Sequence, residues 1–167
     1  MTIVNKSRLA LIAAGLGSML AAGSASAEYR VTAFGDAIAY KALISMDVES
    51  AKSAFYTKDL TKLDFVAANN LCVTQILSKE LSAAVATCNM ALEKVDLDFE
   101  LTVAMEKEAK ASIYSNLAVA KAMSGDYTGA SADLERALQL NGRDRNANVN
   151  YSQISANLDV ADDIAQR

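Results

Sequence analysis

The stretch ASIYSNLAVAKAMSGDYTGASADLERALQLNGRD, residues 111–144, decides the fold of this chain. Apolar residues recur every three to four positions on both sides of the turn Ser124–Tyr127, which predicts two amphipathic helices joined by a tight turn. Small residues lie where the two helices would have to touch, and larger apolar residues surround them. We expect a helical hairpin that packs through Tyr114, Asn116, Leu117, Ala118, Gly125, Tyr127, Ala130, Leu134 and Ala137.

This hairpin resembles a tetratricopeptide repeat, a helix-turn-helix unit of about 34 residues. Internal repetition supports the resemblance, because Asn116 has counterparts in Asn70 and Asn150. Asn116 and Asn150 are 34 positions apart, and Asn70 and Asn116 are 46 apart, which is one repeat plus 12 residues. We therefore expect an all-α fold of two to three antiparallel helix-turn-helix units with a C-terminal capping helix.

The rest of the chain divides into segments around this unit. Residues 65–98 have a similar pattern and would pack through Asn70 and Leu71. A capping helix is expected after the last repeat, because no repeat buries its own apolar face alone. The predicted segments are a signal peptide (1–27), an N-terminal helical segment whose first helix is Phe34–Ile44 and which forms a degenerate repeat (28–64), a repeat-like unit (65–98), an insertion or helix extension (99–110), the repeat described above (111–144) and the capping helix (145–167).

The first 27 residues have the layout of a secretory signal peptide. A short positive region, Asn5–Arg8, precedes 14 mostly apolar residues, Leu9–Ala22, and a small-residue site ends at Ala27. The apolar run is shorter than the roughly 20 residues that a membrane-spanning helix needs. No cysteine lies near the cleavage point, which disfavours a lipoprotein. We predict cleavage between Ala27 and Glu28 and a periplasmic location in a Gram-negative bacterium.

The mature chain would be acidic. The full sequence has 16 Lys and Arg against 20 Asp and Glu, and loss of Lys6 and Arg8 leaves 14 against 20, a net charge of −6. Nucleic-acid binding depends on neutralising phosphates with basic residues, so this balance argues against it. It also argues against adsorption to anionic lipid.

Several residue types that serve catalysis or metal binding are missing. The sequence has no His, no Pro and no Trp. It therefore lacks the commonest general base and the commonest transition-metal ligand. The pattern contains no calcium loop, phosphate loop or nucleophile elbow. We predict no metal, no cofactor and no catalytic residue. The enzymatic alternative is a carboxylate pair that acts on envelope glycan.

The two cysteines lie in the two expected helices of the 65–98 unit. Cys72 and Cys88 are each eight residues from Glu80, near the centre of the turn. Residues equally distant from the turn face each other in an antiparallel hairpin, and export provides an oxidising compartment. We therefore expect a structural disulfide. The alternatives are two buried thiols or, less favoured without a Cys-x-x-Cys motif, a redox pair.

The resemblance also implies a binding surface. In this repeat family the first helices of successive units line a concave groove that receives a peptide or helix. Members that clamp a C-terminal carboxylate use Lys and Arg in the groove, and these are missing here. By resemblance, the groove would be lined by Val66, Asn69, Val73, Ile76, Ser112, Ser115, Val119 and Ala122.

The expected function is a non-catalytic interaction module or adaptor of the cell envelope that binds a peptide or helix of a partner protein. Two alternatives remain beside it. The N-terminal helices could fill the groove and leave no open site. The chain could instead be a self-associating structural protein, a homo-oligomer in which one copy fills the groove of another.

Overall fold

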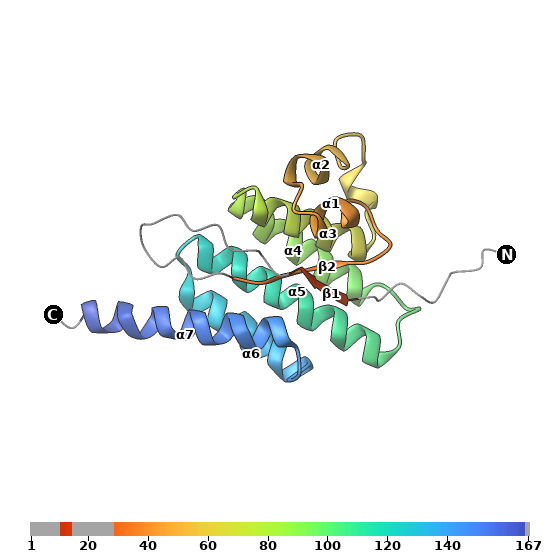
Figure 1. Cartoon of the computed structure of the whole chain (residues 1–167). Helices are drawn as coiled ribbons and strands as arrows, with labels where there is room; N and C mark the ends of the chain where they lie inside the picture. The colour runs from red at the N-terminus through yellow and green to blue at the C-terminus, as the bar shows by residue number, and fades with distance from the viewer. Residues whose placement is uncertain (1–10, 15–28, 166–167) are drawn as a thin grey trace.

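The computed structural model describes residues 11–14 and 29–165. Helices that follow one another as antiparallel neighbours dominate these residues, so the all-α prediction is confirmed (Figure 1). One hairpin consists of α3 (Phe65–Leu77) and α4 (Leu81–Asp96), and the next of α5 (Val103–Met123) and α6 (Tyr127–Leu140). The last helix, α7 (Arg145–Ala165), packs against α5 and α6.

Short polar side chains fix where these helices begin. The Asp64 carboxylate accepts a hydrogen bond from the backbone N–H of the third residue of α3, and Asp126 does the same for α6. Thr102 caps α5, and Asp144 caps α7. Each side chain satisfies a backbone donor that the first helical turn leaves without a partner.

The two hairpin turns have the same local geometry. Gly125 between α5 and α6 has φ 93°, and Lys79 between α3 and α4 has φ 61°. The two positions are 46 residues apart, the same offset as Asn70 and Asn116. Glycine adopts this left-handed conformation without steric cost, whereas a lysine there costs roughly 1 kcal/mol. Because the two turns are equivalent, α4 and α6 leave them in the same direction.

Residues 99–110 contain both features that the sequence left open. Residues 97–102 connect the hairpins, and residues 103–110 extend the N-terminal end of α5. Lys110 in this extension forms ion pairs with Glu106, four residues earlier, and with Asp96 at the end of α4, both at 2.5 Å. Hydrogen bonds to these two carboxylates raise the pKa of Lys110. The extension is thereby anchored to the preceding hairpin.

The N-terminal region differs from the prediction. The first helix was expected to begin at Phe34, but α1 spans only Tyr40–Ile44, and Val31–Phe34 form the strand β2. The β-branched and aromatic residues of Val-Thr-Ala-Phe suit an extended conformation, and Asp36 and Ala39 with positive φ separate it from α1. A second short helix, α2 (Val48–Ser53), and a 3₁₀ turn, η1 (Leu60–Lys62), lead to α3.

A second strand pairs with β2. The strand β1 (Leu11–Ala14) runs antiparallel to β2, with Leu11 opposite Phe34 and Ala14 opposite Val31. β1 lies within the predicted signal peptide, and the predicted cleavage site at Ala27 and Glu28 lies outside the described residues. Among residues 11–14 and 29–165, no helix is long and apolar enough to cross a membrane.

The predicted disulfide between Cys72 and Cys88 is confirmed. It joins α3 to α4 with 5.3 Å between the Cα atoms, and both cysteines are fully buried. Both cysteines belong to an apolar cluster that includes residues of β2, α1, α2, α3, α4 and α5. A second apolar cluster lies between α5, α6 and α7, around Leu134 and Ile154.

Replacement of both cysteines by alanine should lower the free energy of unfolding by about 3 kcal/mol, because the disulfide closes a loop with a sequence separation of 16. Urea unfolding of the oxidised wild type and the double variant measures the difference. Reduction of the wild type should give the same midpoint as the variant. Equal midpoints for the oxidised wild type and the variant would contradict a stabilising role.

Candidate functional site

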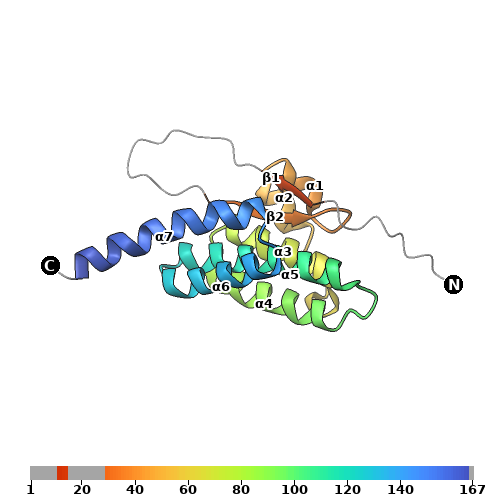
Figure 2. The same ribbon diagram turned by 90° about the horizontal axis from the view of Figure 1, so that it is seen from below.

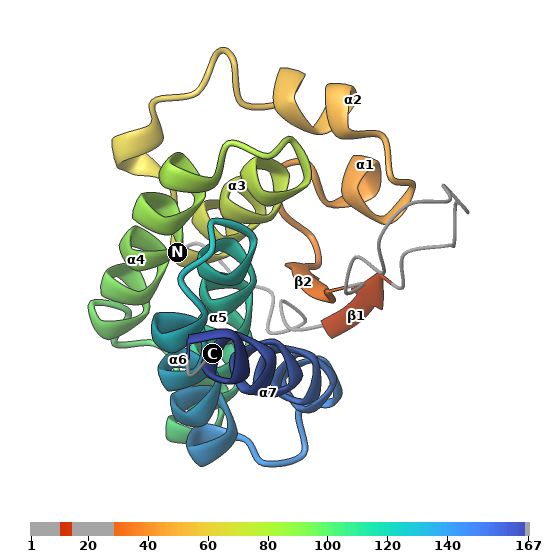
Figure 3. The same ribbon diagram turned by 90° about the vertical axis from the view of Figure 1, so that its left-hand side faces the viewer.

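An extended stretch of chain crosses the helical array. Residues 29–34, which we call the N-terminal segment, include β2 and lie across α5 and α3 (Figures 1 and 3). Three helices each present one asparagine to it: Asn150 from α7, Asn116 from α5 and Asn70 from α3. We call these three residues the asparagine ladder. The segment therefore passes the helices in the reverse of their order in the chain.

Each asparagine of the ladder exchanges two hydrogen bonds with the backbone of one residue of the segment. The Thr32 N–H donates to Asn116 Oδ1 over 2.8 Å, and Asn116 Nδ2 donates to the Thr32 carbonyl over 2.9 Å. Arg30 exchanges the same pair of bonds with Asn150, at 2.8 and 2.8 Å, and Phe34 with Asn70, at 2.7 and 2.9 Å. Two opposed residues in an antiparallel sheet exchange this pattern. The three side-chain amides thus replace a neighbouring strand.

The spacing of the bonded residues fits an extended chain. The ladder binds every second residue of the segment, which matches the alternation of a strand with a rise of about 3.3 Å per residue. The backbone groups of the residues between them, Val31 and Ala33, point to the opposite edge, where β1 pairs. A helical segment could not present its N–H and C=O groups in this way.

A second row of polar contacts holds the ladder in place. Asn69 Nδ2 donates to the Thr32 carbonyl over 2.9 Å, and Asn69 Oδ1 accepts from Asn116 Nδ2 over 2.8 Å. Asn150 Nδ2 also donates to the Ser115 hydroxyl over 3.1 Å. These asparagines and Ser115 are fully buried. Because the amides bind each other, their orientation is fixed by the helices as well as by the segment.

The helices also contact particular side chains of the segment. Asn146 Nδ2 donates to the Thr32 hydroxyl over 2.9 Å, and both side chains are buried. The Phe34 ring is 1% exposed and meets the edge of the Phe65 ring, with 6.1 Å between centroids. The site therefore contacts a hydroxyl residue and, two positions later, an aromatic residue.

The tyrosine at the start of the segment lies near the end of the ladder. Asn157 Nδ2 on α7 donates to the Tyr29 hydroxyl over 3.3 Å. Burial raises the pKa of the Tyr29 hydroxyl, Tyr127 adds to the rise, and the bond from Asn157 opposes it. Tyr29 packs against both apolar clusters, so it links the segment to the two halves of the core.

The predicted groove residues are not open to solvent. Asn69 contacts the segment directly, and Ser115 supports Asn150, so these two belong to the site. The sequence offered, as an alternative to an open groove, one filled by N-terminal helices, whereas the asparagines of the site bind the extended N-terminal segment. All eight predicted groove residues are buried: Val66, Asn69, Val73, Ile76, Ser112, Ser115, Val119 and Ala122.

The residues predicted to pack the hairpins are buried, partly buried or in the turn, and two of them also bind the N-terminal segment. Asn70 and Asn116 were assigned to repeat packing, and the structure places their amides on the N-terminal segment. The recurrence of asparagine at these helix positions was the sequence signal for such a contact, because a buried amide requires hydrogen-bond partners. Leu71, Leu117, Ala118, Ala130, Leu134 and Ala137 are buried, Tyr114 and Tyr127 are partly buried, and Gly125 forms the turn.

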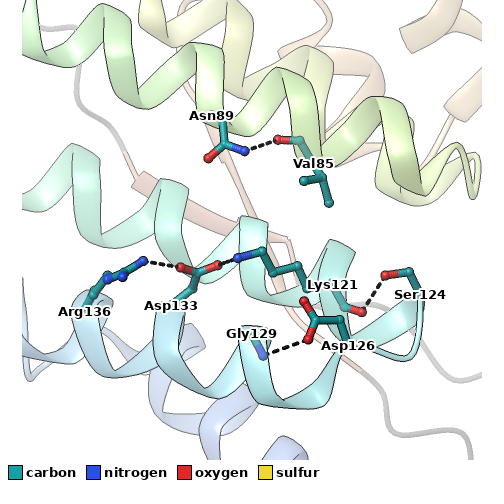
Figure 4. A network of polar contacts seen from close by, with 8 residues as sticks. All are labelled: Val85, Asn89, Lys121, Ser124, Asp126, Gly129, Asp133 and Arg136. Atoms are coloured by element: carbon teal, nitrogen blue, oxygen red, sulfur yellow. Dashed lines mark hydrogen bonds and ion pairs between the residues drawn. The ribbon is translucent and has the colours of Figure 1, made fainter.

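One carboxylate of the described helices is buried, and its charge is compensated. Asp133 on α6 is 1% exposed and forms ion pairs with Lys121 of α5, at 2.5 Å, and with Arg136, at 2.9 Å (Figure 4). The Arg136 guanidinium also lies over the Tyr114 ring. This arrangement fastens α6 to α5 in the second hairpin.

Comparison of the chain with protein-family models, curated proteins and solved structures gave no match. The ladder and the segment that it holds therefore provide the basis for a functional proposal.

Replacement of Asn116 by alanine should lower the free energy of unfolding by about 2–4 kcal/mol, because two buried groups, the Thr32 N–H and Asn69 Oδ1, lose their partners at about 1–3 kcal/mol each. The Thr32 carbonyl keeps the hydrogen bond from Asn69. Amide exchange at Thr32 should accelerate as well. The matched control is Asn89→Ala. Asn89 is exposed on α4, and its amide donates to the Val85 carbonyl of its own helix (Figure 4). Equal losses in both variants, measured by urea unfolding, would deny the ladder a special role.

Replacement of Lys121 by methionine should cost about 2 kcal/mol, because the buried Asp133 loses its better-buried partner while Arg136 remains. Arg136→Met should cost less than about 1 kcal/mol, since the Arg136 side chain is 58% exposed. Thermal unfolding at neutral pH compares the two variants. A larger loss from Arg136→Met would reverse the assignment.

Proposed function

We propose that this chain is a non-catalytic protein-interaction module, similar to tetratricopeptide repeat proteins, whose asparagine ladder binds an extended peptide. The observation that carries the proposal is the set of six hydrogen bonds between three asparagines, on the alternate helices α3, α5 and α7, and alternate backbone residues of one segment. Backbone contacts give affinity for an extended chain of almost any sequence. Such a site recognises conformation first.

The side-chain contacts define the class of peptide. Asn146 offers a hydrogen bond to a hydroxyl at the central position, and Phe65 offers a ring edge to an aromatic residue two positions later. A buried amide left without its partner is costly, so a peptide without the hydroxyl should bind less tightly. The favoured ligand is an extended peptide with the pattern Thr or Ser, any residue, Phe.

The resident segment sets the condition for binding. A segment of the same chain competes at an effective concentration that reaches the millimolar range for short linkers. A partner peptide must displace it or meet a chain in which it has left the ladder. The N-terminal segment therefore acts as an internal ligand that restricts access.

The disulfide and the N-terminal sequence support an exported location. A buried disulfide forms and persists in an oxidising environment. The sequence pattern of residues 1–27 is that of an export signal, and together these features favour the periplasm. There the module would serve as an adaptor of the cell envelope.

Self-association is the second candidate, and the identity of the resident ligand favours it. The same segment from a second copy could make the same bonds, so two chains could exchange segments. Exchange gives a dimer whose population rises with protein concentration, which light scattering detects.

A labelled peptide with the sequence EYRVTAFG, residues 28–35, tests peptide binding at the asparagine ladder. Thr32→Pro in the chain expressed from residue 28 removes the N–H that Asn116 accepts and should release the segment. This variant should bind the peptide at least about tenfold more tightly than wild type, a difference of about 1.4 kcal/mol. Addition of Asn116→Ala should abolish the gain. Fluorescence anisotropy measures the binding.

Two controls accompany this experiment. Phe34→Ala releases the segment in another way and leaves the ladder asparagines unchanged, which covers the case in which Thr32→Pro does not fold. A peptide with proline at the Thr32 position should not bind. Equal affinity in wild type and both released variants, or an affinity that does not change with Asn116→Ala, would refute peptide binding at the asparagine ladder.

A further inference from the structure

The ladder leaves one edge of β2 for another strand. Thr32 and Phe34 direct their N–H and C=O groups to the asparagines. The N–H and C=O groups of successive strand residues point to opposite edges, so those of Val31 and Ala33 face away from the asparagines. The structure pairs β1 with this outer edge, with Ile12 opposite Ala33 and Ala14 opposite Val31.

The strand that occupies the outer edge belongs to the part of the chain predicted to be removed. β1 spans Leu11–Ala14 and precedes the predicted cleavage site at Ala27. Without it, the N–H and C=O groups of two residues of β2 face outward without a strand partner. Such an edge is a template for pairing with another chain.

The outer edge is also held ready for binding. The ladder fixes β2 at alternate residues through backbone bonds, and the Phe34 side chain anchors its end in the core. A strand that is already extended loses little conformational freedom when a second strand joins it, which favours association.

We propose that the outer edge of β2 is a docking site that binds an extended, uncharged apolar strand of a partner protein by antiparallel strand addition. The chemistry of the occupant is taken from β1, whose sequence Leu-Ile-Ala-Ala has no charge and two small residues. A second copy of the chain fits less well. Without residues 1–27 each copy carries a net charge of −6 (14 basic, 20 acidic), and two such copies repel.

Docking at the outer edge does not depend on the proposed peptide binding at the ladder, because it requires the N-terminal segment to stay on the ladder. The two sites have different tests. Binding at the ladder is tested with the peptide of residues 28–35 and the variant Asn116→Ala. Binding at the outer edge is tested with a peptide of residues 8–16 and the variant Ala33→Pro.

The probe is a labelled peptide with the sequence RLALIAAGL, residues 8–16, added to the chain expressed from residue 28. Binding should be saturable and at least about tenfold weaker to the full chain, which carries this strand itself. N-methylation of the peptide at Ile12 or Ala14 removes an N–H that faces β2 and should weaken binding at least about tenfold. N-methylation at Ala13, whose N–H faces away, is the matched control and should change it little.

Variants of the protein give a second measurement. Ala33→Pro removes an outward N–H of β2 and leaves those of Thr32 and Phe34 for the ladder, so it should abolish peptide binding while amide exchange at Thr32 stays slow. The proposal is overturned if the peptide does not bind, or if methylation at Ala13 and Ile12 weakens binding equally. A dimer of the chain from residue 28 that disappears in Ala33→Pro would assign the edge to a second copy and also overturn it.

Discussion

The requirement that a buried amide must have hydrogen-bond partners organises this molecule. Four asparagines on α3, α5 and α7 are fully buried: Asn69, Asn70, Asn116 and Asn150. An unpaired amide at such a position would cost several kcal/mol. The helices cannot supply these partners from their own backbones, because those groups are already bonded within each helix. A strand has unbonded N–H and C=O groups at every second residue along each edge. The N-terminal segment therefore satisfies the helical array, and the array in turn holds the segment extended.

The same requirement explains what the sequence could and could not predict. The helices α3 to α7 follow from apolar periodicity, caps and small residues, which are local properties of the chain. The Cys72–Cys88 pair follows from its symmetry about one turn. The strand β2 is different, because its conformation depends on amides 36, 84 and 120 residues away in sequence. The elements that follow β2 in sequence are helical, so the local pattern assigned Phe34 to a helix. The recurring asparagines were visible, but the segment that they bind was not.

The disulfide and the Asp133 ion pairs serve the ladder indirectly. Each fastens the second helix of a hairpin to the first, α4 to α3 and α6 to α5. Asn70 and Asn116 of the ladder lie on the first helices of these hairpins, and Asn150 lies on α7. The spacing of Asn70 and Asn116 is fixed only if each hairpin is rigid. Side chains held by packed neighbours keep their geometry when a ligand leaves. The array can therefore accept a different extended chain without rearranging its helices.

The two edges of β2 cannot be independent. The outer edge exists only while the N-terminal segment lies on the ladder, because a released segment has no fixed direction. A partner strand that binds the outer edge stabilises the seated segment and so opposes any peptide that would replace it. By reciprocity, a peptide that takes the ladder weakens the outer site by the same factor. One four-residue strand would thus make the two binding events mutually exclusive, and which partner prevails would depend on their concentrations and affinities.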